Sequence, residues 1–87
     1  MRAVVESILR RTGARTRVPF AVRFAGGGEY RNRDEAPAFT LVFNGAAAYA
    51  RIAVFGHIGL LESHFDGQLD IEGSLAKAMA VGMESGL

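Results

Sequence analysis

Apolar side chains occupy every second position in three segments of the chain, 19–24, 38–43 and 68–72. A period of two is typical of a strand with one buried face. The glycine-rich run 25–28 predicts a turn after the first of these strands, so that 29–33 returns beside it as the second arm of a hairpin. The apolar positions on the predicted buried face are Phe20, Val22, Phe24, Phe39, Leu41, Phe43, Leu69 and Ile71.

The first residues of the chain predict an amphipathic helix of about two to three turns. Its apolar face carries Val4, Val5, Ile8 and Leu9, which recur at helical spacing. Gly13 is placed to end this helix, because glycine is the residue that most often follows a helical C-terminus.

Three more helices are predicted in the second half of the chain. An alanine-rich segment, 45–55, follows Asn44, a residue type suited to an N-cap. A short helix is expected over 57–67, and the Gly73-Ser74 pair is expected to cap the last one. The apolar stripe predicted for that last helix consists of Leu75, Ala78, Met79, Gly82 and Met83.

The predicted order of elements is α-β-β-β-α-α-β-α. Strands and helices segregated in this way indicate an α+β fold, a mostly antiparallel sheet of about four strands covered by helices. No internal repeat, low-complexity tract or linker divides the sequence. We therefore expect residues 1–87 to form a single domain.

Composition narrows the class of protein. The 87 residues contain no Cys, which removes disulfides, thiolate nucleophiles and zinc–thiolate sites and favours a cytoplasmic protein. No apolar run approaches the roughly 18–20 residues that cross a bilayer, so a soluble domain is expected. A chain of this length supports one thin core and not a complete enzyme with its own cofactor domain.

The formal net charge of +1 conceals an asymmetry along the chain. Residues 1–51 hold nine arginines against four acids, and 52–87 hold one lysine against five acids. The two parts could fold against each other as one dipolar domain. Alternatively, the arginines form a patch for anionic lipid head groups or nucleic acid.

The sequence offers little conventional phosphate or metal chemistry. The Gly26–Gly28 run lacks phosphate-loop spacing and precedes a predicted strand, so we expect a hairpin turn there. The potential metal ligands also lack the spacing of a zinc or calcium site, and no metal site is expected. These ligands are His57, His64, Asp66, Asp70 and Glu72.

Catalytic side chains are equally sparse. Ser63 and His64 are neighbours on a predicted helix, so their side chains point about 100° apart and do not form a ready dyad. Glu62 and Asp66 lie four residues apart and could share a proton. A small enzyme using Glu62, His64 and Asp66 is the weakest of our hypotheses, and we expect no catalytic residue in this chain alone.

Nucleic-acid binding is not expected either, because the phenylalanines fall on the strand face opposite the arginines and are not free to stack on bases. That phenylalanine-rich face is then either a plain closed core or a core left partly open for an acyl chain. Periodicity alone does not separate these two alternatives.

Residues 58–75 carry the one specific resemblance in the chain. The segment Ile58-Gly-Leu-Leu-Glu-Ser-His-Phe-Asp-Gly-Gln-Leu-Asp-Ile-Glu-Gly-Ser-Leu75 resembles the G-L-G-E-S/A-Y-M-D-G-x-x-D-x-x-x-L segment in the N-terminal domain of cyclopropane-fatty-acyl-phospholipid synthases. Leu61, His64, Phe65 and Gln68 depart from that pattern. The matching residues are Gly59, Leu60, Glu62, Ser63, Asp66, Gly67, Asp70 and Leu75.

The resemblance implies a sterol-carrier-protein-2-like lipid-binding fold and a non-catalytic role. In that family a following methyltransferase domain uses S-adenosylmethionine to add a methylene unit to a phospholipid acyl chain, and this chain carries none of that domain. The run Asp70–Ala78 also resembles the end of free-standing sterol-carrier-like domains, which implies lipid binding without a methyltransferase.

Our leading hypothesis is therefore a lipid-binding and membrane-docking domain, cytoplasmic or peripheral at the inner membrane, of a cyclopropane-fatty-acyl-phospholipid synthase-like methyltransferase. The alternatives are a stand-alone sterol-carrier-like protein, or an interaction module that dimerises through a Met79/Met83 edge or docks its own catalytic domain. The residues expected to contact an anionic surface are Arg10, Arg11, Arg15 and Arg17. The residues expected to face lipid are Phe20, Phe24, Phe39, Leu41, Phe43, Leu69 and Ile71.

Overall fold

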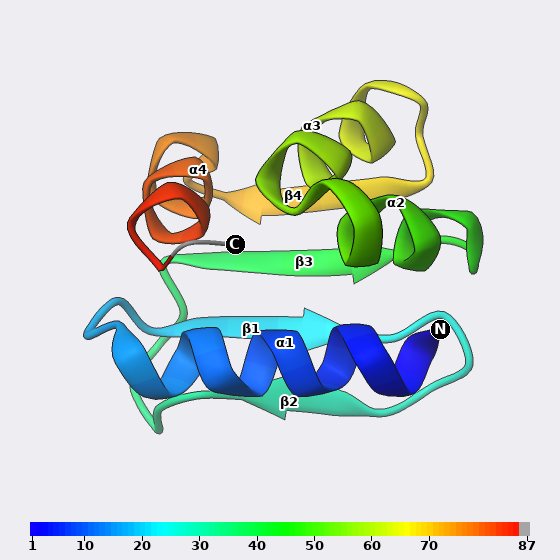
Figure 1. Cartoon of the computed structure of the whole chain (residues 1–87). Helices are drawn as coiled ribbons and strands as arrows, with labels where there is room; N and C mark the ends of the chain where they lie inside the picture. Colours follow the sequence, from blue (N-terminus) through cyan, green and yellow to red (C-terminus); the bar gives the residue numbers. More distant parts are fainter. Residues whose placement is uncertain (86–87) are drawn as a thin grey trace.

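The computed structural model describes residues 1–85, which form four helices and one four-stranded sheet (Figure 1). The order of elements is the one predicted from the sequence. The elements are α1 (Arg2–Arg15), β1 (Phe20–Arg23), β2 (Glu29–Arg31), β3 (Phe39–Phe43), α2 (Ala47–Phe55), α3 (His57–Phe65), β4 (Leu69–Gly73) and α4 (Leu75–Glu84).

The strands lie in the order β2-β1-β3-β4. The β1–β2 hairpin and the β3–β4 pair are antiparallel, so the prediction of a mostly antiparallel sheet is confirmed. The two central strands, β1 and β3, are parallel. In this register Val22 pairs with Tyr30 on one side and with Leu41 on the other.

The helices cover one face of the sheet, with α1 along β1 and β2 and with α3 and α4 near β4 (Figure 1). The face predicted from the alternating apolar residues is the buried one, although Ile71 at its edge is only half-buried. Two pairs of phenylalanine rings stack across the central strands. They are Phe20 with Phe39, 5.1 Å apart, and Phe24 with Phe43, 6.1 Å apart.

Two predicted helix ends are wrong. Gly13 does not end the first helix, which continues to Arg15. Gly13 is instead buried beneath the Tyr30 side chain. A Cβ on Gly13 would lie 2.3 Å from the Tyr30 hydroxyl. Asn44 does not cap α2, whose first residue is Ala47. Its amide group instead donates to the Gly67 carbonyl and to the Asp70 carboxylate.

The last helix begins as predicted but buries a different stripe. The Ser74 hydroxyl accepts a hydrogen bond from the Lys77 amide, which is the expected N-cap. Leu75 and Met83, at the two ends of the predicted stripe, are exposed. The side of α4 that is buried carries Ala78, Val81 and Gly82, with Met79 half-buried.

Asn32 connects α1 to the edge of the hairpin. Its side-chain oxygen accepts from the Phe20 amide at 2.7 Å, and its nitrogen donates to the carbonyls of Gly13 and Val18. Asn32 therefore fixes the chain at the point where it leaves the helix and enters β1.

The two edges of the sheet differ in how their free backbone is protected. β2 is only three residues long, and its outward side chains, Glu29 and Arg31, form an ion pair of 3.5 Å. At the other edge, the Leu69 carbonyl oxygen of β4 lies 3.2 Å from the ring nitrogen Nδ1 of His64 in α3. Helix α3 thus covers one of the backbone groups that β4 directs away from β3.

Candidate functional site

The first part of the segment 58–75 lies in α3 and packs against α2. Gly59 and Leu60 are buried, and the buried Ser63 hydroxyl donates to the Gly59 carbonyl at 2.8 Å. A Cβ on Gly59 would lie 2.1 Å from the carbonyl oxygen of Arg51. These residues allow the two helices to approach closely, which is a structural role.

The polar residues of the same segment are held by local contacts. Asp66 pairs with the Arg51 side chain, and Asp70 accepts from Asn44. Gly67 adopts a positive φ of 77°, which glycine tolerates best. Glu62 is exposed on α3.

The structure does not assemble Glu62, His64 and Asp66 into a catalytic group. His64 contacts the Leu69 carbonyl, and Asp66 faces Arg51. Within residues 1–85, no group of three His, Asp or Glu side chains could hold a metal ion. The Gly26–Gly28 turn joins two strands and does not start a helix, so it is not a nucleotide-binding turn.

The phenylalanine-rich face of the sheet is a closed core in this structure. Its residues pack against α1, α2, α3 and α4, and Val22 and Leu69 are fully buried. The cavity between this face and the helices measures about 10 Å³. Such a volume admits at most one water molecule, so the structure shows no room for an acyl chain there.

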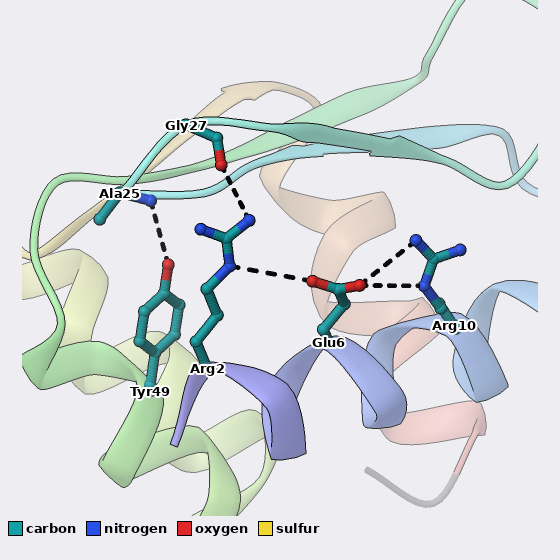
Figure 2. A network of polar contacts seen from close by, with 6 residues as sticks. All are labelled: Arg2, Glu6, Arg10, Ala25, Gly27 and Tyr49. Carbon is teal, nitrogen blue, oxygen red and sulfur yellow. Dashed lines mark hydrogen bonds and ion pairs between the residues drawn. The ribbon is translucent and has the colours of Figure 1, made fainter.

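The four arginines expected at an anionic surface fall into two groups. Arg10 is engaged, since its guanidinium contacts the Glu6 carboxylate at 3.3 Å (Figure 2). The same guanidinium also lies over the Tyr30 ring. Arg11, Arg15 and Arg17 are exposed. None of these three has an ion-pair partner among the residues that the structure describes.

Figure 2 also shows how the start of α1 is fixed to the sheet. Arg2 contacts Glu6 at 3.8 Å and donates to the Gly27 carbonyl in the hairpin turn. The Tyr49 hydroxyl of α2 accepts from the Ala25 amide at 3.0 Å. The start of α1 is thus fixed to the hairpin turn by polar contacts, whereas Arg11 and Arg15 near its end have no ion-pair partner within residues 1–85.

Arg11 and Arg15 both line a groove on the helical side of the domain. The groove lies between α1 and the C-terminal end of α2 and has a volume of about 490 Å³. Its polar rim comes mainly from α1, whereas α2 supplies apolar walls. The lining residues are Ile8, Arg11, Thr12, Arg15, Ile52, Ala53, Val54, Phe55, Gly56 and Ser85.

The wall of this groove continues into an exposed apolar corner, made by Val54, Phe55 and Ile58 where α2 turns into α3. These side chains are 69%, 59% and 50% exposed. Gly56 makes the sharp turn between the helices with a φ of 61°. The corner therefore places apolar side chains in solvent beside Arg11 and Arg15, which form no ion pair with any described residue.

Sequence reasoning identified the arginines but missed the groove and the corner. The segment of α2 was predicted only as an alanine-rich helix, without its exposed face; Tyr49 and Ile52 are on the buried face. The available signal was the apolar run Ile52–Phe55, which is wider than one helix face. Its extra members, Val54 and Phe55, are the ones that point outward.

In comparisons with known proteins, no family model and no curated protein matches the chain. In residues 1–85, no helix is long and apolar enough to cross a membrane.

Proposed function

We propose that this domain docks on an anionic membrane surface and has no catalytic role of its own. The observation that carries the proposal is the adjacency of the cations Arg11 and Arg15 to the exposed corner of Val54 and Phe55. A peripheral membrane protein uses the same combination, because apolar side chains enter the interface while cations contact anionic head groups.

The electrostatic part of the proposal follows from the unpaired arginines. A cation near an anionic leaflet contributes about 1 kcal/mol. Arg11, Arg15 and Arg17 together then contribute about 3 kcal/mol, which corresponds to about a hundredfold in affinity. Arg10 contributes less than the sequence suggested, because it shares the Glu6 carboxylate with Arg2.

The family part of the proposal rests on residues 58–75. Gly59, Ser63, Asp66 and Gly67 each have a definite packing or turn role in the structure, so the segment works as one folded unit. We propose that this unit belongs to a cyclopropane-fatty-acyl-phospholipid synthase-like methyltransferase, in which this domain would hold the enzyme at its phospholipid substrate.

Sedimentation with lipid vesicles tests the docking. The domain is expected to pellet with vesicles of phosphatidylglycerol and phosphatidylcholine, and not with phosphatidylcholine alone. The variant Arg11→Gln/Arg15→Gln/Arg17→Gln should lose about a hundredfold in affinity. The matched control Arg23→Gln/Arg31→Gln/Lys77→Gln removes three charges from other surfaces and should bind as the wild type does. Equal loss in both variants would reject a localised patch.

A further inference from the structure

We infer that the groove between α1 and α2 binds one acyl chain of an anionic lipid, whose head group contacts Arg11 and Arg15. This inference rests on the proposed membrane docking and deepens it, because it assigns a ligand to the same region. The sequence suggested an acyl chain between the sheet and the helices. The groove proposed here lies between α1 and α2 instead.

The first argument is space. The cavity at the sheet face measures about 10 Å³, whereas the groove measures about 490 Å³. Binding sites for small molecules are usually about 300–1,000 Å³. Of the two places that the sequence and the structure offer for an acyl chain, only the groove is large enough.

The second argument is the distribution of chemistry along the groove. Ile8 and Ala53, both half-buried, form apolar surface inside it, and Val54 and Phe55 extend that surface toward solvent. Arg11 and Arg15 lie one helical turn apart on α1 and border the same space. An apolar wall with two cations on one side is complementary to an amphiphile with an anionic head.

The third argument concerns the acids near these cations. Glu84 borders a smaller hollow of about 120 Å³ next to Arg15, yet the two side chains form no ion pair within the described chain. Among residues 1–85, no acidic side chain lines the groove itself. The two guanidinium groups are thus available to an anionic ligand, with which charge-assisted hydrogen bonds would form.

The position of the groove agrees with lipid transfer from a bilayer. Phe55 belongs both to the groove and to the exposed corner proposed to enter the membrane interface. A lipid beneath the docked domain would therefore reach the groove without crossing water. The occupant to which we commit is a bilayer phospholipid, and a free fatty acid serves as its monomeric probe.

Nuclear magnetic resonance titration of the full chain with decanoate, below the concentration at which it self-associates, tests the groove. Saturable shifts are expected for backbone amides of residues 52–56 and 8–15. Decanol, which lacks the charge, should bind at least about tenfold more weakly, and acetate, which lacks the chain, should cause no saturable shift. Absence of saturable decanoate shifts, or shifts confined to the strands, would overturn the inference.

Two variants test decanoate binding in the groove without changing the residues proposed to contact the membrane. Ala53→Leu fills the groove and should weaken decanoate binding by about tenfold while leaving the arginines and the corner in place. Because Ala53 also packs on the core, Ile8→Gln provides a second test through a half-buried groove residue. Circular dichroism verifies that each variant is folded. Wild-type decanoate affinity in both folded variants would reject the groove as the site.

The outcomes for the groove and for docking are distinguishable. If vesicles bind and decanoate does not, the groove inference fails and the docking proposal stands. If decanoate binds in the groove and anionic vesicles do not sediment the domain, docking fails and the groove remains a site for monomeric amphiphiles. Loss of both in Arg11→Gln/Arg15→Gln, with both retained in Arg23→Gln/Arg31→Gln, supports the shared use of the two arginines.

Discussion

Gly59 in α3 packs directly against the backbone of Arg51 in α2, and a methyl group on Gly59 would lie 2.1 Å from the Arg51 carbonyl oxygen. Asp66, at the end of α3, pairs with the side chain of the same arginine. Arg51 is thus contacted through its backbone at one end of α3 and through its guanidinium at the other. The angle between the two helices, and with it the corner of Val54 and Phe55, depends on these contacts.

Replacing Gly59 by Ala is expected to destabilise the domain by about 3 kcal/mol, because the added methyl group meets backbone that cannot rotate away. The midpoint of urea unfolding measures this change. Gly45→Ala is the matched control, since its Cβ would approach only the end of the Gln68 side chain, at 3.0 Å. Similar midpoints for the two variants would contradict the close approach of α2 and α3.

Replacing Asn32 by Ala is expected to cost about 2–3 kcal/mol, because it removes three hydrogen bonds and leaves the Phe20 amide without its acceptor. Asn32→Asp should lose at least as much, because one carboxylate oxygen would face the Gly13 and Val18 carbonyl oxygens, which also only accept. Unfolding followed by circular dichroism gives both values. A loss of less than about 1 kcal/mol in either variant would contradict the role of Asn32 at this junction.

Replacing Phe55 by Ser is expected to weaken vesicle binding by at least about tenfold, because a buried aromatic side chain contributes about 1.5–3 kcal/mol on leaving water. Phe65→Ser is the control: Phe65 is 74% exposed but does not line the groove. Vesicle sedimentation of the two variants side by side measures the difference. If Phe65→Ser loses as much affinity as Phe55→Ser, the membrane-facing surface is not the corner at α2 and α3.

Salt is expected to weaken vesicle binding strongly, since the Debye length falls from about 10 Å at 0.1 M to about 3 Å at 1 M. The variant that lacks Arg11, Arg15 and Arg17 should show a shallower dependence on salt, because fewer ionic contacts remain to be screened. Sedimentation at several sodium chloride concentrations measures the two slopes. Parallel slopes for wild type and variant would show that these arginines do not carry the attraction.

Much of the fold could be predicted from the sequence because each strand and helix has a clear apolar period. Periodicity, however, describes one element at a time and contains no pairing information, so the parallel contact of β1 with β3 was not evident. The sequence rules for helix ends also failed at two residues that make contacts with distant parts of the chain. Gly13 accommodates Tyr30, and Asn44 serves Gly67 and Asp70, so neither acts at the end of a helix.

The candidate site was predicted only in part. The count of arginines pointed to an anionic partner, but which of them are free depends on acids that the fold brings near. Glu6 reaches Arg10 from one turn away, whereas Arg11 points to the other side of the helix. The groove combines α1 with residues about 40 positions later, such as Phe55, and only the tertiary structure places them together.

The protected edges of the sheet have a consequence for how copies of the domain behave at high concentration. β2 has only three residues, and two of them, Glu29 and Arg31, are charged. On β4, the His64 imidazole contacts the Leu69 carbonyl oxygen. Both edges are therefore poorer templates for a strand from another molecule than long, uncovered strands would be. In concentrated solution, copies of the domain are accordingly less prone to pair edge to edge.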